Sequence, residues 1–292
     1  MTDAYKGILA MIGCCTVWGL SPIFYKLLID VPPLELLSHR LFWSVLVFAI
    51  VLAMQRRLRE IPVALNSPRK VILVFGAAAM IAVNWTLFIF SVQVGRVVEA
   101  ALGYYIFPLV AVCIGYVALG ERLGWSQALA VVLATIAVTV LTLGLGAPPW
   151  ISLALAVTFG IYGLLKRWVA AGPVVSVATE ALVVSPLCIL YLFLLGSEGI
   201  FGRDLGLSAL LILSGPLTAV PLALFSYAAK RASMATIGLV QYVNPSLQFF
   251  CAVLLFGEPM TVWHAIAFPI IWIALALYSW AGFRGGAAPI RS

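Results

Sequence analysis

The sequence predicts an all-α integral membrane protein, with ten transmembrane helices arranged as two inverted five-helix repeats. The prediction rests on composition, on the lengths of the apolar runs and on an internal similarity between the two halves of the chain. Of the 292 residues, 64% are hydrophobic and 9% are charged, whereas a soluble domain carries roughly a quarter charged residues. Lipid is therefore expected to be the solvent for most of the surface.

The apolar runs divide the chain into ten predicted spans. An α-helix rises about 1.5 Å per residue, so about 20 apolar residues cross a hydrocarbon core of about 30 Å. The first run continues through Trp18 and Pro22 without a small-residue cleavage pattern, which favours a spanning helix over a signal peptide. Charge, glycine and proline delimit the spans at 7–28, 35–54, 71–94, 98–119, 126–145, 148–168, 174–195, 208–230, 234–256 and 261–283.

The basic residues between the spans predict the orientation. One side collects thirteen of them: Lys6, Arg56, Arg57, Arg59, Arg69, Lys70, Arg122, Lys166, Arg167, Lys230, Arg231, Arg284 and Arg291. The other side collects two, Arg96 and Arg203. Because Lys and Arg favour cytoplasmic loops, both termini are expected on the cytoplasmic side. The net charge of +7 thus indicates membrane orientation, and no nucleic-acid partner is expected.

An internal similarity predicts the two repeats, at residues 1–146 and 147–292. Residues 82–145 match residues 219–282 at an offset of 137, and 18–26 match 159–167 more weakly. The offset pairs Phe88 with Phe225, Tyr105 with Tyr242, Pro108 with Pro245, Gly120 with Gly257 and Glu121 with Glu258. Since five spans is an odd number, the second repeat enters the membrane from the opposite side. Inverted repeats are typical of secondary transporters, whose substrate site lies near the midplane between the halves.

Several motifs also resemble a known family: HRLFWS, NWTLFIFSV, VEAALGYYIFPL, GERL, FGIYGLLKR and GLVQYVNPSLQFF. Across nearly the whole chain they resemble the drug/metabolite transporter superfamily, in particular EamA transporters of the RarD and YddG type. The resemblance implies a ten-helix carrier of the bacterial inner membrane. It implies export of amino acids or related metabolites, and in some relatives of toxic organic compounds. It does not fix a substrate.

A polar stripe on the ninth span is the first candidate binding feature. Gln241, Asn244 and Gln248 lie at i, i+3 and i+7, so they share one helix face. Their amides donate and accept hydrogen bonds, as the charged groups of a zwitterion require. In lipid such a stripe faces either a wet cavity or neighbouring helices, and both interpretations stay open.

Aromatic side chains form the second candidate feature. Tyr104 and Phe107 are the repeat equivalents of Gln241 and Asn244, so an aromatic stripe lies opposite the polar one. Asn84 is an amide among apolar neighbours, and either a substrate contact or a helix–helix hydrogen bond explains it. The predicted substrate-binding set is Trp18, Ser21, Asn84, Trp85, Phe88, Tyr104, Tyr105, Phe107, Tyr242, Gln241, Asn244 and Gln248.

Three ionisable residues within spans are candidates for gating or proton coupling. His39 and Glu180 occupy equivalent places in the second span of each half, one near each mouth. The adjacent Arg40 either reaches the outer interface by snorkelling or attracts an anionic group. The alternative for His39 is simple packing beside Glu35. Depth along the helices separates Arg40 from Glu180 by roughly 13 Å, so no ion pair between them is expected.

Prolines within spans are candidate hinges, with Pro108 and Pro245 as the repeat-matched pair. Each removes a backbone hydrogen bond and bends its helix, and static curvature is the alternative to a hinge.

The sequence argues against an enzyme. It has two histidines, no catalytic or nucleotide-binding motif, and five cysteines that all lie in apolar runs without metal-ligand spacing. No cofactor and no metal are expected. The predicted function is secondary export of amino acids, neutral, aromatic or threonine- and methionine-like, by alternating access. Organic-cation or drug export and a non-transporting assembly subunit are the alternatives. The sequence leaves the oligomeric state open, and a monomer is compatible with it.

Overall fold

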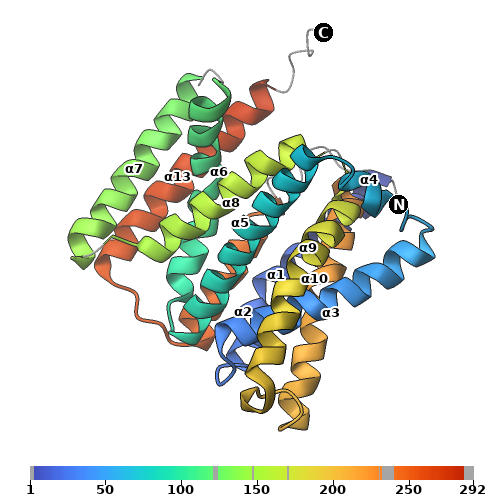
Figure 1. The fold of residues 1–292 in the computed structure, drawn as a ribbon. Helices are drawn as coiled ribbons and strands as arrows, with labels where there is room; N and C mark the ends of the chain where they lie inside the picture. The colour runs from blue at the N-terminus through green and yellow to red at the C-terminus, as the bar shows by residue number, and fades with distance from the viewer. Residues whose placement is uncertain are drawn as a thin grey trace.

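The computed structural model describes residues 3–120, 124–146, 148–169, 171–229, 231 and 240–285, and the described chain is helical apart from one isolated β-bridge between Phe201 and Asp204 (Figure 1). The first half comprises α1 (Asp3–Gly19), α2 (Ser21–Lys26), α3 (Pro33–Met54), α4 (Glu60–Ala64), α5 (Pro68–Gln93), α6 (Val97–Leu119) and α7 (Trp125–Leu145). The second comprises α8 (Trp150–Trp168), α9 (Pro173–Leu195), η1 (Gly196–Glu198), α10 (Leu205–Ala229), α12 (Val243–Phe250), η2 (Cys251–Leu255) and α13 (Val262–Gly285).

These helices coincide with the predicted spans. Seven described segments are long and apolar enough to cross a membrane, and three shorter apolar ones fall in α8, in α12 with η2, and in α13. The first span is interrupted between α1 and α2, where Ser21 begins a new helix with Pro22 in its first turn. The predicted start of the ninth span, and Glu121 with Arg122, lie outside the described residues. The fold class is therefore confirmed as a ten-span helical membrane protein.

Helix pairing repeats between the two halves. Helices α6 and α5 pack on α8, and their counterparts α12 and α10 pack on α1. Likewise α3 packs on α10 as α9 packs on α5. The self-equivalent pairs α3 with α9 and α7 with α13 pack directly on each other (Figure 1). This is the pairing that two inverted repeats produce, while the division at residue 146 stays a prediction.

Two repeat-matched glycines allow close helix approaches. A Cβ atom at Gly19 in α1 would lie 2.6 Å from Cβ of Leu247 in α12. A Cβ atom at Gly160 in α8 would lie 2.6 Å from Cδ1 of Ile114 in α6. Gly19 and Gly160 are equivalent positions at an offset of 141. Small residues at such crossings let membrane helices approach closely, so each half uses a glycine at the same junction.

The predicted hinge prolines occupy unlike positions. Pro108 lies inside α6 and removes a hydrogen bond from a continuous helix. Pro245 lies in the first turn of α12, directly after a turn at Gln241 and Tyr242, where its missing N–H breaks no bond within that helix. The hinge role of the pair stays a prediction.

Candidate functional site

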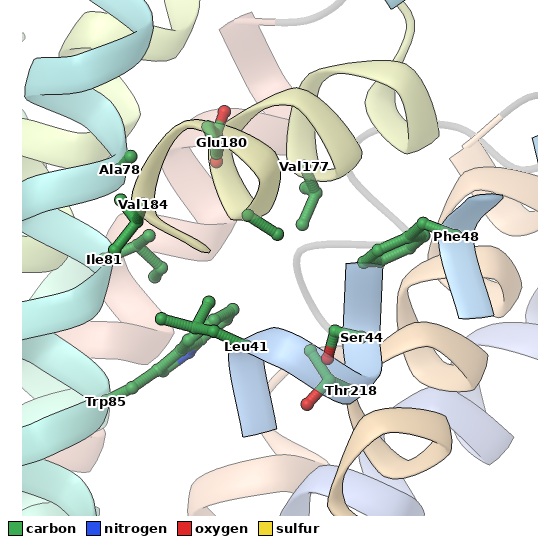
Figure 2. A pocket seen from close by; sticks show the side chains of 11 residues that line it. Leu41, Ser44, Phe48, Ala78, Ile81, Trp85, Val177, Glu180, Val184 and Thr218 are labelled. Atoms are coloured by element: carbon green, nitrogen blue, oxygen red, sulfur yellow. The ribbon is translucent and has the colours of Figure 1, made fainter. Parts of the chain in front are cut away.

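A pocket lies where the halves meet, and its described lining comes from two repeat-equivalent helix pairs, α3 with α9 and α5 with α10. Its enclosed volume is about 10 Å³, so in this conformation the pocket is nearly closed and holds no more than about one water molecule. Figure 2 shows Glu180 on one side of the pocket, and Trp85, Ser44 and Thr218 on the other. The remaining lining is apolar: Leu41, Phe48, Ala78, Ile81, Val177, Ala181 and Val184. Its position on the pseudo-symmetry axis is the one predicted for a transport site.

Arg40 lies beside the pocket, held by two of its lining residues. Its Nε donates to Oγ1 of Thr218 at 2.8 Å, and its Cζ lies 4.1 Å from the centroid of a Trp85 ring. The same Cζ atom lies 5.6 Å from the centroid of the Tyr25 ring. The residue is 5% exposed. Because the side chain is enclosed by α3, α5 and α10, it does not reach the outer interface by snorkelling.

Glu180, in α9, is neutralised by its own half of the chain. Its Oε1 lies 2.6 Å from Nζ of Lys166 and accepts a 2.9 Å hydrogen bond from Ser176, and its Oε2 accepts a 3.1 Å bond from the Tyr162 hydroxyl. Lys166 also donates to Ser176. As the depth argument predicts, no ion pair joins Glu180 to Arg40 among the described residues. Sequence reasoning missed Lys166 because it counted this residue with a cytoplasmic loop.

A series of aromatic rings connects the two charged sites. Centroid distances are 5.9 Å from Tyr25 to Phe88, 5.8 Å from Phe88 to Tyr104, 6.0 Å from Tyr104 to Phe159 and 5.8 Å from Phe159 to Tyr162. The first three pairs are edge-to-face and the last is stacked, and rings at these separations are favourable packing partners. Phe88 and Tyr104 were predicted. Phe159 was not, although the repeat match places it opposite Trp18 and could have indicated it.

Asn84 uses both ends of its amide between helices. Its Nδ2 donates to the carbonyl of Leu155 at 2.9 Å and to Oγ1 of Thr158 at 3.0 Å. Its Oδ1 accepts from the hydroxyl of Tyr104 at 3.0 Å. The amide thereby joins α5 to α6 and α8. This geometry is the one expected of a helix–helix hydrogen bond.

The amide stripe faces α1 and α6, away from the lining of the described pocket. Nε2 of Gln248 donates to Oδ1 of Asn244 at 3.0 Å, and Oε1 of Gln248 is buried without a partner in the described part of the chain. Gln241 lies in the turn before α12. The stripe is therefore a polar feature separate from the described wall of the pocket.

The other predicted residues make contacts outside the described pocket lining. The hydroxyl of Tyr105 hydrogen-bonds that of Ser246 at 2.7 Å, so it joins α6 to α12. The ring of Trp18 lies 6.4 Å from that of Phe225, and the ring of Phe107 lies 4.8 Å from that of Phe159. Ser21 and Tyr242 have more local surroundings: Ser21 donates to the carbonyl of Trp18, and Tyr242 is half-buried against the core.

His39 packs against the second half. Its ring stacks on Phe201 at 4.8 Å, and its Nδ1 is buried without a partner among the described residues. Glu35 does not bond His39 here, because its Oε1 accepts from the backbone N–H of Ile200 at 2.7 Å. His39 and Glu35 therefore both join α3 to the segment after η1.

A second carboxylate, Glu258, joins the halves at the same end of the bundle. Its two oxygens accept from the backbone N–H groups of Val97 at 2.7 Å and Val98 at 2.8 Å. A carboxylate is favourable at this position because the first N–H groups of α6 lack partners within the helix. The repeat-matched pair Glu121 and Glu258 was the sequence signal for this cap, which sequence reasoning did not assign.

Comparisons with known proteins decide the family. Residues 5–143 match the model of the EamA-like transporter family. An uncharacterized transporter of Vibrio cholerae serotype O1 is 39% identical over 99% of this chain and 97% of its own length. The chain belongs to the EamA-like transporter family. Protein RarD of Streptomyces exfoliatus, 42% identical over 95% of this chain and 89% of its own, extends the likeness within the drug/metabolite transporter superfamily.

The fold of this EamA-like transporter is shared with a solved crystal structure. The two align with a TM-score of 0.63 over 96% of this chain and 98% of the other, at 18% identity. Identity at that level shows the fold alone. Together with the curated relatives, it makes the chain a multi-pass membrane transporter and not an enzyme.

Proposed function

We propose that this EamA-like transporter is a secondary carrier that exports amino acids across the bacterial inner membrane by alternating access. One observation carries the proposal. The pocket on the pseudo-symmetry axis has a cation beside one wall, Arg40, and a mainly apolar lining that includes Trp85, while Glu180 in the other wall is paired with Lys166. An amino acid with an apolar or aromatic side chain is a solute that such surroundings complement.

Alternating access requires contacts between the halves that can break and re-form. The caps of Glu258 on α6 and of Glu35 on Ile200 are such contacts, both at the end away from the basic loops. Opening that end exposes their carboxylates to water, which compensates for the lost hydrogen bonds. A rocking motion about the α3–α9 contact can therefore open this mouth without leaving charges unpaired.

The proposed orientation places both termini in the cytoplasm. The supporting observation is the distribution of Lys and Arg, thirteen against two, between alternate loops of ten spans. In this orientation Glu35 and Glu258 lie at the periplasmic end, and the Lys166–Glu180 pair lies toward the cytoplasmic end.

A counterflow screen tests the function. Purified full-length protein in liposomes preloaded with unlabelled threonine, methionine or phenylalanine should accumulate the labelled amino acid transiently and saturably. The screen is run with and without a pH gradient, which separates proton-coupled export from movement down the solute's own gradient. Uptake equal to that of protein-free liposomes for the whole panel would overturn amino-acid export.

The two alternatives have less support. A buried cation beside the pocket repels an organic cation, so Arg40 does not favour export of cationic drugs. Membership of a transporter family does not favour a non-transporting assembly subunit. Substrate-dependent thermal stabilisation separates carriers from such a subunit, because only a formed site gains stability on binding.

A further inference from the structure

Arg40 is a buried cation that the protein leaves without a carboxylate partner. Of the described Lys and Arg side chains it alone is buried. The ion pairs in the described part of the chain are Lys6–Asp3, Arg57–Glu60, Arg96–Glu99 and Lys166–Glu180. Burying a charge without an opposite charge is costly, so a side chain in this position needs a reason beyond packing.

The two buried carboxylates nearest to this region are used elsewhere. Glu35, five residues before Arg40, accepts from the backbone of Ile200. Glu180, across the pocket, is held by Lys166 and two hydroxyl groups. Neither carboxylate therefore balances the guanidinium.

The surroundings of Arg40 hold it as a receptor for a planar anion. Thr218 accepts from Nε, and the Trp85 ring lies against the guanidinium at 4.1 Å. The Tyr25 hydroxyl also hydrogen-bonds the side chain, so two of the five N–H donors of the guanidinium have partners within the protein. The remaining donors are enough for the two parallel hydrogen bonds that the guanidinium fork makes with a carboxylate. Trp85 and Thr218 also line the pocket, so a solute there is next to this fork.

We propose that Arg40 binds the carboxylate of the transported solute. This inference rests on the proposed function and narrows it: the substrate class is defined by a carboxylate, with an apolar or aromatic body against the pocket lining of Leu41, Ile81 and Val184. The amino group of the solute contributes less to recognition than its carboxylate does, because Glu180 is already paired with Lys166. Arg40 is thus a specificity-determining residue that selects acids over their uncharged and cationic analogues.

The test uses four probes of one size: phenylalanine, phenylalaninamide, phenethylamine and 3-phenylpropionate. Full-length protein in an uncharged detergent is titrated with each, and affinity is taken from the concentration dependence of thermal stabilisation. The two acids, phenylalanine and 3-phenylpropionate, should stabilise the wild type, whereas phenylalaninamide and phenethylamine should bind about 10- to 100-fold more weakly. Equal stabilisation by the amide, or none by either carboxylate, overturns the proposal.

Variants assign this preference to one side chain. Arg40→Met should lose the preference for acid over amide, and Arg40→Lys should keep part of it because lysine retains charge without the fork. Thr218→Val keeps the charge and removes the hydroxyl that orients it, so it should lose less of the preference for acid over amide than Arg40→Lys does. The matched control is Arg57→Met, a half-buried arginine after α3, away from the pocket, whose pKa is raised by its hydrogen bond to Glu60. A wild-type preference in both Arg40 variants overturns the proposal.

Two further comparisons separate solute binding at Arg40 from lipid binding there, and from the proposed export of amino acids. Phosphatidylglycerol added to the detergent should not replace the carboxylates; stabilisation by this lipid together with no response to the acids would overturn a solute site. If 3-phenylpropionate binds through Arg40 but no amino acid shows counterflow, the carboxylate site stands and amino-acid export fails. If counterflow is saturable but Arg40→Met keeps the wild-type preference, export stands and the assignment of Arg40 fails.

Discussion

The second long helix of each half carries a buried charge, and the two halves treat that charge differently. In the first half, Arg40 of α3 lies against the ring of Tyr25. In the second half, Glu180 of α9 pairs with Lys166. Tyr25 and Lys166 are equivalent positions at an offset of 141, and so are His39 and Glu180. The same contact between first and second span thus holds an ion pair in one half and a cation on an aromatic ring in the other.

This difference shows how inverted repeats divide their roles. Breaking an internally neutralised pair removes a partner and leaves a charge buried, so the Glu180 site is expected to govern stability. A cation with no internal partner is a cost in the folded protein unless a ligand meets it, so the Arg40 site is expected to govern binding. Both halves share the contact between first and second span, while the charged residues of the second span lie at neighbouring positions and differ in sign, since Glu180 matches His39 and Arg40 matches Ala181.

The largest effect is expected from Arg40→Met on transport. The counterflow rate at low substrate should fall about 10- to 100-fold, because a charge-assisted bond to the solute is lost. The melting temperature should change little, since the variant removes a buried unpaired charge together with its contacts to Thr218 and Trp85. Rates and melting curves on the same preparation check both. A large loss of stability with unchanged transport would reverse the assignment.

The next effect is expected from Glu180→Gln on stability. The change leaves Lys166 without its counter-charge and should cost about 2 kcal/mol, moderated because the lysine is 23% exposed. Adding Lys166→Met should recover much of this loss, a coupling that a double-mutant cycle in detergent measures directly. Additive losses in the double variant would show that the pair contributes nothing as a pair.

Helix packing gives the third effect, again as a comparison of equivalent positions. Gly19→Ala should cost about 1–3 kcal/mol, because the new methyl group meets Cβ of Leu247 and the carbonyl oxygen of Asn244. Gly160→Ala should cost less, since it meets the flexible end of Ile114. Melting temperatures of the two variants check the order; a larger loss at Gly160 would contradict it.

Asn84→Ala should cost about 1 kcal/mol of stability and leave substrate affinity near the wild-type value. The reason is that both ends of the amide bond other helices. Thermal stabilisation by phenylalanine in the variant provides the affinity. A clear drop in affinity without a drop in melting temperature would instead support a substrate contact.

The smallest effect is expected in the pH dependence of His39→Asn. Glu180→Gln should flatten the pH profile of counterflow more than His39→Asn does, because only Glu180 lines the pocket. Initial rates across a pH series give both profiles. Profiles identical to that of the wild type in both variants would remove these residues from proton coupling.

Much of the fold follows from the sequence, because lipid leaves helices as the only structure that satisfies the backbone of these apolar runs. The offset of 137 also predicts that halves are related and inverted. Side-chain partners across helices do not follow in the same way. Lys166 lies at the end of its span, where position alone cannot distinguish a loop cation from the partner of Glu180.

The candidate site shows the same limit. Helical spacing predicts correctly that Asn244 and Gln248 share a face, yet it cannot say which helix meets that face. Phe159 completes the ring series only because α8 packs on α6 and α5. The cap of Glu258 on α6 likewise requires that a loop of the second half meets a helix of the first. Such partners depend on tertiary packing, which helical periodicity and amino-acid composition do not determine.

The most direct test of the account measures competition in counterflow. Unlabelled phenylalanine and phenylalaninamide compete with a labelled amino acid in liposomes that contain wild-type protein or Arg40→Met. Carboxylate binding by Arg40 predicts that the acid competes about 10- to 100-fold better than the amide in the wild type, and that the two compete about equally in Arg40→Met. Equal competition in the wild type, or an undiminished preference for the acid in the variant, would contradict it.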